Sequence, residues 1–132
     1  MIEVKRPEPK ELEGLIPLYQ KFLNEIDCQM TDEQILKSLM LCDSNRGLLL
    51  IATDNGLPVA VSGGIFNADV FIGEIAYIKN EYRYKLNRFI KEMIIRIKSR
   101  AKFWDIICAP ERYKLWSKLN FKCHKVWFRR AL

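Results

Sequence analysis

The chain has 132 residues, of which 49% are apolar and 29% charged, as expected for one folded domain and not for a disordered segment. Its longest apolar run, Leu48 to Ala52, is far shorter than the roughly 20 residues that span a bilayer. The first residues carry no apolar signal core. We therefore expect a single cytoplasmic domain over residues 1–132, with no membrane association.

The four cysteines form no CxxC pair, and the chain has one histidine, His124. A structural zinc site needs four ligands at close spacing, so we expect no metal and four reduced thiols. His124 follows Cys123 in an alternating segment, which favours a strand position over a catalytic one.

Charge is distributed unevenly along the chain. Residues 1–78 carry 6 basic and 12 acidic side chains, whereas residues 79–132 carry 16 basic and 4 acidic ones. A positive C-terminal part attracts a nucleotide, a nucleic acid or an acidic protein, but a solvated basic face needs no partner at all. Charge alone leaves both interpretations open.

Hydrophobic periodicity and turn residues predict ten elements in chain order. Thr31 with Gln34 is typical of a helix capping box, Asn55-Gly56 of a tight hairpin, and Gly63-Gly64 of a bulge or a close backbone approach. We expect strands over residues 2–6, 48–54, 57–67, 70–78, 104–109 and 122–130, and helices over residues 9–26, 31–42, 81–102 and 110–119.

The resulting order, β-α-α-β-β-β-α-β-α-β, predicts an α/β (α+β) domain. An antiparallel meander followed by a β-α-β crossover gives a mixed sheet with helices on both faces.

This order resembles the GNAT N-acetyltransferase superfamily over nearly the whole chain. Residues 78–83, I-K-N-E-Y-R, are similar to the V-x-P-E-Y-R that ends the family's fourth strand. Residues 115–121, L-W-S-K-L-N-F, are similar to its L-Y-E-K-L-G-F. The family's usual last strand is missing, so the C-terminal strand would leave an exposed edge that a homodimer or another chain could cover.

The resemblance implies acetyl-CoA as cofactor, with its pyrophosphate bound by an R/Q-x-x-G-x-G/A loop at a helix N-terminus. Both glycine positions of that loop hold bulky residues here, Leu86 and Arg88. The implied cofactor-binding residues are Ile78, Arg83, Tyr84, Lys85, Leu86, Asn87, Arg88 and Trp116.

Two further family markers are absent. Ala109 stands where an Asn often holds the pantetheine arm, and Trp116 stands where a Tyr commonly protonates the departing thiolate. An indole N–H cannot act as a general acid near neutral pH. Four departures together predict altered acetyl-CoA binding or its loss.

Glu74 lies where the family often places the carboxylate that takes a proton from the acceptor amine; an outward-facing strand residue is the plainer interpretation. One hypothesis is an acyl-CoA-dependent N-acetyltransferase with Glu74 as base and an unidentified amine as acceptor. The alternative is a catalytically inactive GNAT-fold protein, loosely similar to bacteriophage acetyltransferase-like proteins. It would bind a protein or nucleic acid through its basic C-terminal half.

Overall fold

The structure is a computed structural model that describes residues 1–122. Within these residues the strands are β1 (Ile2–Lys5), β2 (Gly47–Asp54), β3 (Leu57–Asn67), β4 (Val70–Ile78) and β5 (Phe103–Asp105). The helices are α1 (Ile16–Glu25), α2 (Asp32–Cys42), α3 (Asn87–Lys98) and α4 (Tyr113–Lys118). None of the described helices is long and apolar enough to cross a membrane.

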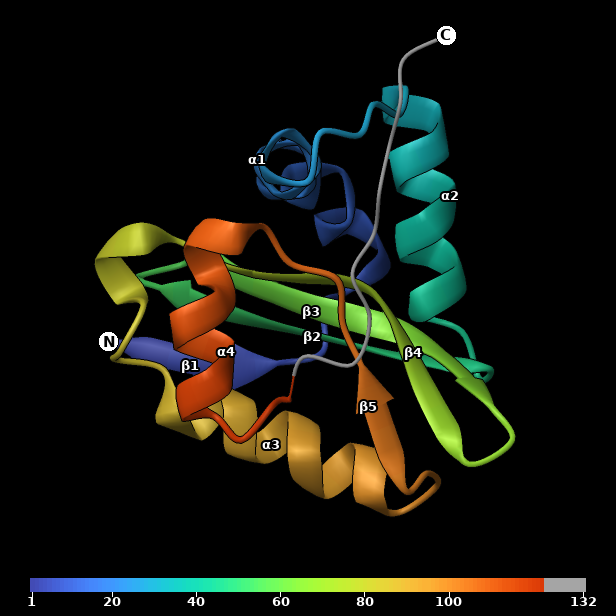
Figure 1. Cartoon of the computed structure of the whole chain (residues 1–132). Helices are drawn as coiled ribbons and strands as arrows, with labels where there is room; N and C mark the ends of the chain where they lie inside the picture. Colours follow the sequence, from blue (N-terminus) through green and yellow to red (C-terminus); the bar gives the residue numbers. More distant parts are fainter. Residues whose placement is uncertain (123–132) are drawn as a thin grey trace, which may run out of the picture.

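The described strands form one sheet in the order β1-β2-β3-β4-β5, with α1 and α2 on one face and α3 on the other (Figure 1). Neighbouring strands are antiparallel, except for the parallel pair β4 and β5 that α3 connects. This is the mixed sheet that the sequence predicts. The last predicted strand, residues 122–130, lies outside the described residues apart from Lys122.

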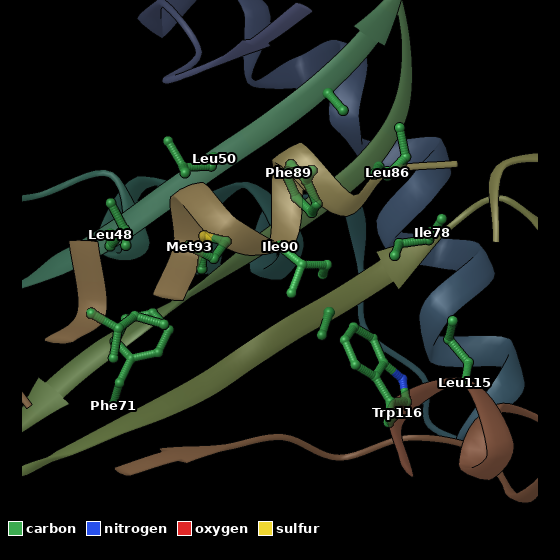
Figure 2. Packing of buried hydrophobic residues seen from close by; sticks show 14 of the residues in the cluster. Leu48, Leu50, Phe71, Ile78, Leu86, Phe89, Ile90, Met93, Leu115 and Trp116 are labelled. Carbon is green, nitrogen blue, oxygen red and sulfur yellow. The ribbon is translucent and has the colours of Figure 1, made fainter. Parts of the chain in front are cut away.

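Alternation along β2 divides the core into two layers. Leu48 and Leu50 face α3, where they join Phe89 and Met93 in one buried cluster (Figure 2). The intervening residue Leu49 faces α1 and α2 in the second cluster. Successive strand side chains point to opposite faces, so a continuous apolar run indicates a strand buried on both sides.

The local signals at the helix cap and the hairpin are confirmed. The hydroxyl of Thr31 accepts a hydrogen bond from the Gln34 backbone at 3.2 Å, and the Gln34 side chain accepts one from the Thr31 backbone at 2.9 Å. Asn55 and Gly56 both have positive φ, 51° and 85°, as a tight two-residue hairpin turn requires.

Two predicted helices begin later than expected. Residues 9–15 form short 3-10 turns, and α1 starts at Ile16 because Pro17 has no N–H to donate to an earlier turn. Residues 80–86 form a 3-10 turn and a loop before α3, because the backbone N–H of Lys85 bonds to the Tyr82 carbonyl at 3.0 Å.

The predicted strand at 104–109 is shorter than expected and only partly buried. β5 covers Phe103–Asp105 alone, since its pairing with β4 ends at Ile72 opposite Asp105. The chain over residues 106–109 has no strand assignment.

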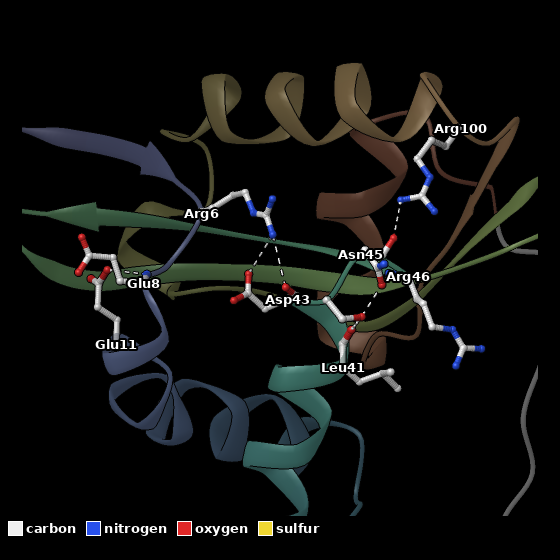
Figure 3. Close-up of polar contacts among 9 residues, drawn as sticks. Arg6, Glu8, Glu11, Leu41, Asp43, Asn45, Arg46 and Arg100 are labelled. Atoms are coloured by element: carbon white, nitrogen blue, oxygen red, sulfur yellow. Dashed lines mark hydrogen bonds and ion pairs between the residues drawn. The ribbon is translucent and has the colours of Figure 1, made fainter.

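Polar contacts join the loop after α2 to the segment after β1 and to the end of α3 (Figure 3). Arg6 donates to the carboxylate of Asp43 at 3.4 Å. Arg100 donates to the Asn45 carbonyl at 3.2 Å, and its guanidinium lies 3.9 Å from the centre of the Phe66 ring. Part of the positive charge in the C-terminal half is therefore engaged in internal contacts.

The Gly63-Gly64 pair lies at a β-bulge. Gly63 pairs with Ile75 and Gly64 with Gly73, so Glu74 is the extra residue on β4. A Cβ on Gly64 would lie 2.2 Å from the carbonyl oxygen of Ile72. Strand β4 can approach β3 this closely only if position 64 has no side chain.

We expect Gly64→Ala to lower the free energy of unfolding by at least about 1–3 kcal/mol, because the added methyl group would press on rigid backbone. Gly14→Ala is the matched control: a Cβ there meets nothing within 4 Å, so its effect should be neutral or slightly stabilising. Urea unfolding of the two variants measures both changes. Equal effects would contradict the close approach at Gly64.

Candidate functional site

The segment between β4 and α3 turns back on itself before the helix begins. The Tyr82 N–H donates to the Lys79 carbonyl at 2.9 Å, and the Arg83 N–H to the Asn80 carbonyl at 3.3 Å. Much of this loop therefore satisfies its own backbone, and the amides left for a ligand lie at the start of α3.

The N-terminus of α3 has no side-chain cap. Leu86 occupies the N-cap position, offers no polar atom, and is followed by a first turn without an acidic residue. By contrast, α2 begins with the Thr31 cap and with Asp32 and Glu33 in its first turn. The first amides of α3 and the positive end of its dipole are thus favourable for an anion.

Side chains of the same loop border an open hollow of about 470 Å³. The Arg83 guanidinium donates to the Asn80 side chain at 2.9 Å, and its buried Nε has no hydrogen-bond partner within residues 1–122. The ammonium of Lys118 lies 5.0 Å from the centre of the Tyr84 ring, so α4 also contacts the loop. The hollow is lined by Asn80, Glu81, Arg83, Tyr84 and Lys85.

Leu86 and Trp116, both named from the sequence, have side chains in the core. Each is only 3% exposed and packs in the cluster beneath α3 (Figure 2). The Leu86 side chain therefore does not fill the hollow, and only its backbone is left to contact a ligand. The indole N–H of Trp116 is buried and has no partner among the described residues.

Glu74 is exposed at the bulge of β4 and acts electrostatically on one residue of α1, Tyr19, and one of α2, Cys42. Burial raises the pKa of Tyr19 to about 12 and that of Cys42 to about 12, and the charge of Glu74 adds to both shifts. The Tyr19 hydroxyl also bonds to the Ser38 hydroxyl at 2.8 Å. Tyr19 and Cys42 therefore stay protonated near neutral pH.

The structure gathers some of the named residues and separates others. Arg83, Tyr84 and Lys85 line one hollow, and exposed Asn87 and Arg88 follow at the start of α3. Glu74 lies four residues before Ile78, roughly 13 Å away along the strand. Ala109 is buried where the chain enters the turn before α4. Cys123 and His124 lie outside the described residues.

Sequence reasoning missed a bond that holds the loop. The Tyr82 hydroxyl donates to the carboxylate of Asp54 in the β2–β3 hairpin, 28 residues earlier. This bond is the main cause that lowers the pKa of Asp54. Tyr82 was visible within the E-Y-R motif, but nothing in the sequence pairs it with Asp54.

It also missed Arg112, which is 3% exposed and donates two hydrogen bonds to Glu25, at 3.1 and 3.0 Å. No local signal distinguishes this arginine from the other basic residues of the C-terminal half.

Several solved structures described as acetyltransferases or predicted acetyltransferases share this architecture. A predicted acetyltransferase from Clostridium acetobutylicum, solved with acetyl-CoA, matches with a TM-score of 0.73 and 12% identity over 99% of this chain and 96% of its own. Glucosamine-6-phosphate N-acetyltransferase from Arabidopsis thaliana matches with 0.72 and 11% over 99% and 98%. The PaiA N-acetyltransferase from Thermoplasma acidophilum, in complex with coenzyme A, matches with 0.71 and 17% over 96% and 92%.

No family model matches the sequence, and no curated protein is similar enough to be detected. At these identities the structural likeness establishes the fold: the chain has the GNAT fold. A similarity to bacteriophage proteins is not supported.

We expect Leu86→Ala to lower the free energy of unfolding by about 2–5 kcal/mol, because its side chain is buried in the core beneath α3. Arg88→Ala, exposed in the first turn of the same helix, should change it by less than about 0.5 kcal/mol. Urea unfolding provides the comparison. A negligible effect of Leu86→Ala would mean that this side chain does not pack as described.

We expect Tyr82→Phe to reduce the loss of stability in acid. The pKa of Asp54 is lower in the folded chain than in the unfolded one, so its bond with Tyr82 stabilises the fold fully above the ordinary carboxyl pKa. This contribution disappears as the pH falls through the lowered pKa. Melting temperatures from about pH 7 to about pH 3 test this. Tyr84→Phe, which removes an exposed hydroxyl from the same loop, should leave the pH profile unchanged; identical profiles for both variants would contradict the assignment.

Proposed function

We propose that this protein is an acyl-CoA-dependent N-acetyltransferase that uses acetyl-CoA and transfers the acetyl group to an amine yet to be identified. One observation carries the proposal: the uncapped N-terminus of α3, flanked by Arg83 and Lys85, lies at the end of β4 in a GNAT fold. A helix N-terminus beside two cations suits a pyrophosphate. Acetyl-CoA and CoA in two solved structures of this fold support the choice of cofactor.

The residues present fit such a ligand even without the two glycines. The first amides of α3, the buried Nε of Arg83 and the indole N–H of Trp116 are donors without a side-chain acceptor in residues 1–122. Buried polar groups without partners are costly, and the phosphate and carbonyl oxygens of an acyl-CoA are acceptors. Because the Leu86 side chain is packed in the core, it does not occupy the space in which a phosphate would approach the loop.

When bound, acetyl-CoA supplies a thioester that an amine can attack. The carboxylate of Glu74 then takes the proton from the amine nitrogen, directly or through a water. Arg83, Lys85 and Arg88 neutralise phosphate charge at the start of α3. The indole N–H of Trp116 has no partner within residues 1–122 and cannot release a proton near neutral pH, so Trp116 would not serve as a general acid.

Nothing in the structure of residues 1–122 favours the alternative of a catalytically inactive binding protein. Arg100 and Arg112, two members of the basic C-terminal half, make internal contacts and are not free for a partner. The expected homodimer depends on a strand outside the described residues.

We expect acetyl-CoA to raise the melting temperature. At about 100 times its dissociation constant it adds roughly 2.7 kcal/mol, which corresponds to a shift of roughly 10 °C for a domain of this size. The double variant Arg83→Ala/Lys85→Ala should lose most of the shift, whereas Lys91→Ala, exposed about one turn into α3, should keep it.

Turnover gives the second readout. Candidate amines are screened for release of free CoA thiol from acetyl-CoA. With an amine that is acetylated, Glu74→Gln should lower the turnover rate at saturating substrates by about 100-fold or more, while acetyl-CoA still raises the melting temperature of this variant. No thermal shift at millimolar acetyl-CoA would refute the proposal. Full activity of Glu74→Gln would remove Glu74 from the mechanism.

A further inference from the structure

Much of β4 lacks a neighbouring strand on the side away from β3. Pairing with β5 stops at Ile72, although β4 continues to Ile78. Within residues 1–122, no strand pairs with residues 73–78 on that side. A free strand edge exposes carbonyl and N–H groups, and an extended ligand that carries amides can pair with them.

Arg112 covers the end of this edge. It precedes α4 and is 3% exposed, and its Nη1 donates to the carbonyl of Ile78, the last residue of β4. Its Nε and Nη2 donate to Glu25 at 3.1 and 3.0 Å. The guanidinium also lies 4.8 Å from the centre of the Tyr77 ring. One side chain thus joins β4, the last residue of α1 and the start of α4.

The chain around Arg112 wraps across the edge of the sheet. Arg112 contacts Tyr77, which belongs to the core layer under α1 and α2. Three and four residues later, Leu115 and Trp116 pack into the opposite layer with Ile78 (Figure 2). The segment that closes the edge is therefore anchored on both faces, and Arg112 supplies its polar contact with β4.

Helix electrostatics do not explain the position of Glu25. It is the last residue of α1, where the dipole disfavours a negative charge. Only Arg112 forms an ion pair with it among the described residues. The Glu25 side chain is 27% exposed and therefore in contact with water, whereas the Arg112 side chain is only 3% exposed. The pair can thus open from the Glu25 side.

We propose that Arg112 and Glu25 form a gate over the end of the β4 edge. The inference rests on the proposed function: the pantetheine arm of acetyl-CoA is an extended chain with two amides, and it competes with Arg112 for the Ile78 carbonyl. The arm enters only when Arg112 leaves that carbonyl. The apparent affinity for acetyl-CoA is then the intrinsic affinity multiplied by the fraction of molecules in which the gate is open. The binding of the nucleotide part at the start of α3 does not depend on the gate.

Calorimetric titration with two probes tests the gate. One probe is acetyl-CoA, and the other is 3′-phosphoadenosine 5′-diphosphate, which lacks the pantetheine arm. Glu25→Gln keeps the shape of the side chain but removes its charge, so acetyl-CoA should bind about 3–10-fold more tightly. Arg112→Met should tighten it by more than about tenfold. The nucleotide should bind all variants equally, and Glu33→Gln, an exposed carboxylate on α2, should behave as the unaltered chain.

The two probes separate the failure of the gate from that of the proposed function. If the nucleotide binds but acetyl-CoA binds Glu25→Gln no more tightly than the unaltered chain, the gate is wrong and the cofactor site stands. Weaker binding of acetyl-CoA to Arg112→Met than to the unaltered chain would also overturn the gate, because Arg112 would then contribute to binding the ligand. If neither probe binds any variant, the proposed function is wrong and the gate with it. If Arg112→Met does not fold, the acetyl-CoA affinity of Glu25→Gln alone tests the gate.

Discussion

The divergence of β4 from β5 after a short paired stretch is the constraint on which the rest of this structure depends. Pairing between the two strands ends at Ile72, next to the bulge that leaves Glu74 without a partner on β3. A bulge bends a strand and increases its twist, so β4 can diverge at this point. Beyond this point β4 pairs only with β3, and the 79–86 loop, the start of α3 and the chain before α4 gather around its end. Each polar group of the candidate cofactor site lies close to that end, and Glu74 lies at the point of divergence.

The positive charge of the C-terminal half has several separate uses. Arg100 fixes the loop after α2, and Arg112 holds the end of β4 against α1. Arg83 and Lys85 border the hollow at the start of α3. A basic composition therefore does not imply one basic surface here. Arg83 and Lys85 lie near an uncapped helix N-terminus, where side-chain charge and helix dipole add for the same anion.

Leu86 shows how a loop without glycines can still approach a ligand. A bulky residue at this position would obstruct a phosphate if its side chain pointed outward. Its burial beneath α3 directs it inward and also leaves the helix without a side-chain cap. The same residue thus stabilises the core and keeps the first amides of α3 available. The cost of an uncapped helix is offset by the packing of its apolar face.

The sequence by itself determined the features that depend on near neighbours. The Thr31 capping box, the Asn55-Gly56 turn, the doubly buried run of β2 and the order of the strands and helices within residues 1–122 each follow from residues a few positions apart. Only the tertiary structure decided where α3 begins, how short β5 is, and how Leu86 points. It also paired Tyr82 with Asp54 and Arg112 with Glu25, which are 28 and 87 residues apart. Contacts at such separations leave no periodic trace in the chain, because they arise when packed elements bring distant side chains together.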